Sequence, residues 1–148
     1  MNTLLLVIVV ATVGGIAVTL QGNFMGTMTR TMGTLESMFI TYGSGGIVVA
    51  ALFLIRALTA GSGLSHWREV PVYAFSAGLL GLVIVGSIGF ATARYGLIAT
   101  FAIILVAQYG SAAVIDHFGL FGAPVQALDP LRMVGIALLL MGAWLVLR

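Results

Sequence analysis

The feature that most constrains this chain is a series of long stretches without a charged residue. They cover residues 1–29, 37–55, 70–93 and 95–115, with a shorter stretch at 133–147. The hydrocarbon core of a bilayer is about 30 Å thick, and a helix needs about 20 apolar residues to cross it. The four longer stretches meet this length and the fifth comes close, so we expect a protein that crosses a membrane several times.

The composition agrees with a membrane environment. The chain is 61% hydrophobic and 7% charged, whereas soluble domains contain about 25% charged residues. None of the stretches alternates polar and apolar residues as a lipid-facing barrel strand would, which predicts helical spans. Residues 1–20 lack a basic start and precede four further spans, so we expect the first span to be retained rather than cleaved as a signal peptide.

The sequence predicts an all-α membrane protein with a single domain, residues 1–148, made of five transmembrane helices. We expect these helices at about residues 3–25, 33–55, 70–91, 97–115 and 130–148. The connection at 57–69 is the most polar one, and 92–96 is short enough to make its two flanking helices an antiparallel pair. Asp129 followed by Pro130 is typical of a helix start, with the acid as N-cap and the proline in the first turn.

The arginines bear on the orientation of the chain, because basic residues gather on the cytoplasmic side of membrane proteins. Five spans would put Arg56, Arg68 and Arg132 on one side and Arg30, Arg94 and Arg148 on the other. A chain without a charge bias can insert both ways, and two opposite copies form an inverted-repeat architecture. We therefore expect an antiparallel homodimer, or a pair with an oppositely inserted paralogue; a fixed topology with a weak bias is the alternative.

Small residues form stripes along the predicted helices. In lipid, helices pack through close backbone approach, which glycine permits. The predicted packing positions are Gly43 and Gly46 in the second helix and Gly78, Gly81, Gly86 and Gly89 in the third.

Polar residues lie on or next to these small-residue faces, which predicts that they point into the bundle. The candidate substrate-binding residues are Gln21, Asn23, Glu36, Gln108 and Ser111, with Phe39 and Phe101 as apolar walls. Intramembrane polar groups are costly unless they are paired or line a wet cavity. The alternative interpretation is plain interhelical hydrogen bonding, worth about 0.6 kcal/mol per bond.

Glu36 is the only acid inside a predicted span. It is a candidate proton- or cation-coupling carboxylate, because ionisable groups inside membranes mark ion pathways. It is also a candidate structural residue, either in the first turn of a helix, where the macrodipole favours an anion, or paired with Arg30.

Other classes of function are excluded by what the sequence lacks. The chain contains no cysteine, and its two histidines, His66 and His117, fall in separate predicted loops. Neither lies beside a plausible nucleophile or a pair of carboxylates, so we expect no metal site, no cofactor and no enzyme activity. Asp116 and His117 follow the fourth helix, where Gly119 suits a left-handed helix end, and should face headgroups and water. Six basic residues against four acidic ones are too sparse for a nucleic-acid partner.

The C-terminal segment at 107–148, "AQYGSAAVIDHFGLFGAPVQALDPLRMVGIALLLMGAWLVLR", resembles the small YdcZ-like proteins, a branch of the drug/metabolite transporter (DMT) superfamily. The matching positions are Gln108, Asp116, His117, Phe118, Gly119, Arg132, Gly135 and Gly142, together with Gln21 near the end of the first helix. Family members often carry an asparagine where this chain has Met25, and an apolar residue or a proline is common near the position of Glu36, so the resemblance does not imply a family-wide role for this carboxylate. The resemblance implies five-helix subunits that pair into a ten-helix unit in the bacterial inner membrane.

Three functions agree with these features. The first is a secondary transporter, an exporter that works by alternating access, with Gln21 and Gln108 hydrogen-bonding a small molecule whose identity the sequence leaves open. The second is a dual-topology ion channel like the small fluoride channels, although these have only four spans. The third is a membrane scaffold that transports nothing.

Overall fold

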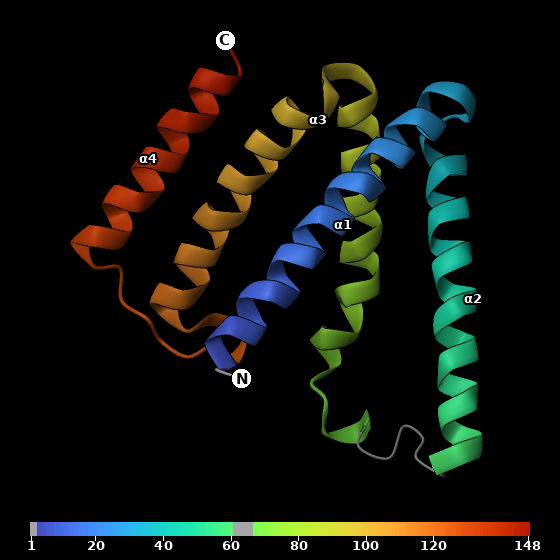
Figure 1. The fold of residues 1–148 in the computed structure, drawn as a ribbon. Helices are drawn as coiled ribbons and strands as arrows, with labels where there is room; N and C mark the ends of the chain where they lie inside the picture. The colour runs from blue at the N-terminus through green and yellow to red at the C-terminus, as the bar shows by residue number, and fades with distance from the viewer. Residues whose placement is uncertain (1–2, 61–66) are drawn as a thin grey trace. The chain divides into compact units, whose positions relative to one another are not determined.

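The computed structural model describes residues 3–60 and 67–148, and within these ranges the chain is helical without any strand. The long helices are α1 (Thr3–Met32), α2 (Thr34–Ala60), α3 (Ala77–Phe118) and α4 (Pro130–Val146) (Figure 1). Short 3-10 helices occur at η1 (Trp67–Glu69), η2 (Val72–Ser76) and η3 (Leu120–Gly122). The all-α class is confirmed. His66 and much of the predicted 57–69 connection lie outside the described residues.

Three described segments are long and apolar enough to cross a membrane, namely Thr3–Met32, Thr34–Thr59 and Val72–Phe118. The apolar helix Pro130–Val146 is shorter, and its 17 residues extend about 26 Å at the usual helical rise. A set of membrane-length helices is therefore present, while the number of five spans stays a prediction.

The turn between α1 and α2 consists of a single glycine. Gly33 has a positive φ of 106°, a conformation that glycine adopts without steric cost. Its N–H donates to Thr29 O at 3.1 Å, and its carbonyl accepts from the N–H of Ser37 at 3.2 Å. The same residue therefore ends α1 and begins α2, so α1 continues to Met32, beyond the predicted end near residue 25.

The predicted helix 70–91 begins later than expected, because the 3-10 helix Val72–Ser76 precedes the start of α3 at Ala77. From Ala77 on it is joined to the predicted helix 97–115 within α3, and the predicted connection at 92–96 is reduced to one residue. Gly96 alone leaves helical geometry, with φ 77° and ψ 176°, a region that is essentially restricted to glycine. Arg94 stays helical, and its guanidinium donates to Phe90 O at 3.0 Å and lies 3.5 Å from the centroid of the Phe90 ring. The sequence predicted the place of the break correctly but overestimated its length.

The chain divides into two packing units, residues 1–94 and 95–148. In the first unit, residues 77–94, here called the first arm of α3, lie against α1 and α2. A Cβ atom at Gly26 of α1 would be 2.7 Å from Thr92 Cγ2, and one at Gly89 would be 3.2 Å from Met25 Cε. The first arm also lies against α2, because a Cβ at Gly86 would be 2.8 Å from Met38 Sδ.

The glycines predicted to mediate packing fall into two groups. Side chains of α1 or α2 lie within 4 Å of a Cβ placed at Gly81, Gly86 or Gly89, whereas no described residue comes within 4 Å of a Cβ placed at Gly43, Gly46 or Gly78. The close helix contacts are therefore made by three of the four predicted glycines of α3, and not by those of α2.

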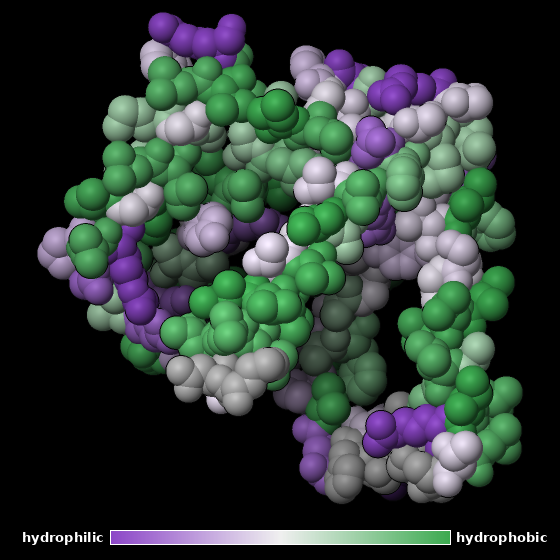
Figure 2. Space-filling view, in the orientation of Figure 1, coloured by the Kyte–Doolittle hydropathy of each residue, from purple (hydrophilic) through white to green (hydrophobic). Residues whose placement is uncertain are grey.

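The buried core of the chain is small. Among the described residues, the buried hydrophobic side chains are Met25 and Ile88, with 1% and 6% of their surface exposed. Two buried hydroxyls lie in the same unit: Ser37 Oγ is 2.9 Å from Thr29 Oγ1, and Thr92, 4% exposed, has no hydrogen-bond partner for its Oγ1 in the described part of the chain. A third, that of Thr100 in the second unit, donates to Gly96 O at 2.8 Å. The outer surfaces of the helices are largely hydrophobic (green in Figure 2), as expected where lipid replaces water.

In the second unit, local signals fix the connection between α3 and α4. Gly119 adopts the predicted left-handed conformation, with φ 62°. Asp129 caps α4 as predicted, and its Oδ1 accepts from the N–H of Arg132 at 2.7 Å. Asp116 and His117 were expected in the loop after the fourth helix, but they lie in the last turns of α3, which continues to Phe118. His117 is exposed, and its Nδ1 accepts from the N–H of Leu128 in the following loop at 3.3 Å.

Candidate functional site

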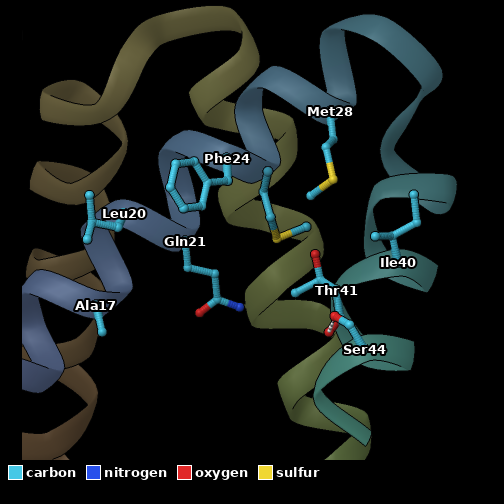
Figure 3. Close-up of a pocket in the computed structure, with 9 residues that line it drawn as sticks. Ala17, Leu20, Gln21, Phe24, Met28, Ile40, Thr41 and Ser44 are labelled. Carbon is cyan, nitrogen blue, oxygen red and sulfur yellow. Dashed lines mark hydrogen bonds between the residues drawn. The ribbon is translucent and has the colours of Figure 1, made fainter. Parts of the chain in front are cut away.

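An open groove of about 400 Å³ lies between α1 and α2 (Figure 3). It is lined by Ala17, Leu20, Gln21, Phe24, Met25 and Met28 of α1 and by Ile40, Thr41 and Ser44 of α2. Residues three and four apart lie on one face of a helix. The lining positions follow this spacing, so each helix contributes one continuous face to the groove.

Gln21 is the longest polar side chain in the groove. Its amide extends from α1 toward Thr41 and Ser44 of α2 (Figure 3). Among the residues that the structure describes, none forms a hydrogen bond with this amide. Both its N–H donors and its carbonyl acceptor are therefore available to a ligand.

The hydroxyls of Thr41 and Ser44 on the opposite wall of the groove already donate hydrogen bonds to their own helix. Thr41 Oγ1 donates to Ser37 O at 2.8 Å, and Ser44 Oγ donates to Thr41 O at 3.2 Å. Each hydroxyl has one hydrogen and two lone pairs. The oxygens of Thr41 and Ser44 can therefore act only as acceptors toward the groove while these bonds are kept.

Glu36 lies in the first turn of α2 and is exposed. Its carboxylate folds back toward the turn, because a Cβ at Gly33 would collide with Glu36 Oε2. The Arg30 guanidinium donates to Thr27 Oγ1 at 3.1 Å, and no ion pair joins Arg30 to Glu36 in the described part of the chain. This position agrees with the helix-terminal interpretation of Glu36, and the carboxylate is not part of the groove lining.

Asn23 and Phe39 also lie outside the groove lining. Asn23 is exposed on α1, where its main-chain carbonyl accepts from Thr27 Oγ1 at 3.1 Å. Phe39 has 79% of its surface exposed. Their predicted contact with substrate stays a prediction.

The remaining predicted site residues belong to the second unit. Gln108 is exposed, Phe101 is partly buried, and Ser111 Oγ donates to Ala107 O at 2.8 Å. The predicted convergence of Gln108 with Gln21 stays a prediction, because the two residues belong to different units.

Most of the chain is similar to a known protein family. Residues 6–145 match the model of a family described as "Putative inner membrane exporter, YdcZ". The chain belongs to the YdcZ family. No curated protein and no solved structure matches it.

Membership of the YdcZ family confirms the resemblance that the C-terminal motif indicated. Together with the membrane-length helices, it makes the chain a multi-pass protein of the inner membrane. The matched range includes every residue that lines the groove. An exporter family also agrees with the expectation that the protein is not an enzyme.

Gln21, which the sequence indicated as a candidate, lines the groove, whereas Thr41 and Ser44, which face it, were not among the predicted site residues. Thr41 and Ser44 stand three residues apart in an otherwise apolar stretch of helix, so they share a face, and this spacing was the available signal. It was weak because a hydroxyl that bonds its own helix is common in membrane segments and needs no ligand.

Proposed function

We propose that the protein is a secondary transporter that exports a small molecule across the inner membrane by alternating access. The observation that carries the proposal is the amide of Gln21, which forms no hydrogen bond with the described residues and extends into an open groove between two membrane-length helices. A polar group in a membrane is costly unless it is paired or wetted. A transported ligand that binds this amide and is then released would explain why the described residues leave it without a hydrogen bond, and such a ligand is expected in a family of exporters.

The functional unit in this proposal is an antiparallel dimer of ten helices, formed by two copies or by the chain and an oppositely inserted paralogue. The equal division of the six arginines supports insertion in both orientations. The small buried core and the extensive exposed apolar surface leave ample area for a second subunit. In such a dimer each subunit contributes a groove, and opening toward one side mirrors opening toward the other.

Counterflow in proteoliposomes tests the transport mechanism. We expect vesicles preloaded with a ligand, identified by thermal-shift screening of metabolites and drugs, to accumulate the labelled ligand transiently and with saturation. A transporter exchanges ligand across the membrane through one alternating site, which produces this overshoot. A current without counterflow would instead indicate a channel, and the absence of both would indicate a scaffold.

Labelling of a single introduced cysteine tests the dual topology. The chain has no cysteine, and Ala127 is exposed in the α3–α4 connection, so Ala127→Cys provides one reactive position. We expect a membrane-impermeant maleimide to label about half of the copies in intact cells, because the arginine tally gives no preferred side. Permeabilised cells, in which all copies should react, serve as the control. Labelling of all or none of the copies in intact cells, without an oppositely inserted paralogue, would contradict the proposal.

A further inference from the structure

We infer that the groove between α1 and α2 selects an uncharged, amphipathic molecule that carries a hydroxyl or amide donor on an apolar body. This inference rests on the proposed function, because it takes the groove to be the transport site. It is derived from three properties of the groove: its lack of charge, the direction of its hydrogen bonds and the nature of its apolar wall.

The described residues that line the groove contain no ionisable side chain. Glu36 is the only acid in the sequence of α1 and α2, and although it precedes Ile40 by one helical turn, its carboxylate is turned toward Gly33. The arginines of these two helices, Arg30 and Arg56, are not part of the groove lining. A charged ligand would enter the groove without a counter-charge, and an unpaired charge is costly away from water. The groove therefore disfavours both cations and anions.

The hydrogen bonds of the groove specify the polar end of the ligand. Thr41 Oγ1 and Ser44 Oγ donate to main-chain carbonyls of their own helix and can only accept from a ligand. Gln21 offers an amide that can donate and accept. A hydroxyl or a primary amide satisfies both sides at once, whereas an ether oxygen has no hydrogen for Thr41 or Ser44.

The rest of the wall is apolar and adaptable. Phe24, Met25 and Met28 form part of it, and methionine side chains adjust to ligands of different shape. The volume of about 400 Å³ lies in the usual range for small-molecule sites. The polar end of the ligand should lie near Gln21, with its apolar body along Phe24 and the two methionines.

Methyl NMR of the full-length protein tests the inference directly, because two of its seven methionines line the groove. The methyl groups of Met25 and Met28 report on the groove, while Met133 and Met141 of α4 report on nonspecific partitioning. The probes are four molecules with one skeleton: 4-phenyl-1-butanol, its methyl ether, 4-phenylbutylammonium and 4-phenylbutyrate.

We expect the alcohol to shift the Met25 and Met28 signals with saturation and to leave Met133 and Met141 unchanged. The ether should bind about tenfold more weakly, since it cannot donate a hydrogen bond, and the two ions should not saturate these signals. Thr41→Val keeps the shape of the side chain and removes its acceptor, so it should reduce the preference for alcohol over ether. An unchanged unfolding curve in SDS, followed by circular dichroism, would show that this variant is folded.

Three results would overturn the inference. Binding of the ammonium or the carboxylate as tightly as the alcohol would show that the groove accepts charge. Equal binding of ether and alcohol would show a purely apolar groove, such as one filled by a lipid chain. Met25 and Met28 signals that respond to protein concentration but to no probe would show that a second copy fills the groove. Selective alcohol binding without counterflow of any ligand would instead refute the proposed transport and leave the selectivity of the groove intact.

Discussion

Gln21→Leu is expected to weaken ligand binding by about 10- to 100-fold and to reduce counterflow accordingly, while the protein remains folded. Leucine has nearly the same size as glutamine but cannot form hydrogen bonds. Loss of one or two hydrogen bonds in a groove away from water costs about 1–3 kcal/mol, which corresponds to this range of affinity. The Gln21 amide forms no hydrogen bond within the described chain, so its removal should leave the melting temperature unchanged or raise it.

The matched control for Gln21→Leu is Thr19→Val on the same helix. Thr19 is exposed, donates to Gly15 O at 3.0 Å and does not line the groove. We expect its substitution to leave both binding and counterflow unchanged. Counterflow of Gln21→Leu equal to that of the unmodified protein would show that the groove is not the transport site.

Gly26→Ala is expected to destabilise the first unit by about 1–3 kcal/mol, the usual cost of overpacking. The added Cβ would lie 2.7 Å from Thr92 Cγ2 and 3.2 Å from Thr92 Cβ. Threonine is branched at Cβ and stiff at χ1, so the contact can be relieved only by moving α1 away from the first arm of α3. Unfolding in SDS, followed by circular dichroism, measures the loss.

Two further variants separate this contact from the general effect of replacing a helical glycine. A Cβ added at Gly14 would have no neighbouring atom within 4 Å among residues 3–60 and 67–148, so Gly14→Ala should be neutral or stabilising by up to about 1 kcal/mol. Thr92→Ala removes the crowded methyl and should restore part of the stability of Gly26→Ala, with a coupling energy of about 1 kcal/mol. Equal effects at Gly14 and Gly26 would contradict the close packing of α1 on α3.

Helix starts and ends that depend on local chemistry could be predicted well. Asp129 with Pro130, and Gly119 at the end of α3, adopt the expected conformations because capping depends on a few neighbouring residues. The end of α1 was placed too early, near Met25. A helix does not stop where its apolar stretch stops, and α1 continues through Arg30 to the turn at Gly33.

The amino-acid sequence alone is enough to establish that this protein lies in a lipid bilayer, that it is helical and to which family it belongs. Long uncharged stretches can satisfy their backbone groups in lipid only as helices or closed barrels, and the C-terminal motif is continuous in the chain. The packing of the helices was needed to show that Gln21 faces Thr41 and Ser44 across a groove and that Glu36 turns away from it. Helical periodicity gives the face of each helix but not which faces meet. The pairing of α1 with α2 depends on the one-residue turn at Gly33. The packing of α1 on α3 depends on the close approach of Gly26 to Thr92.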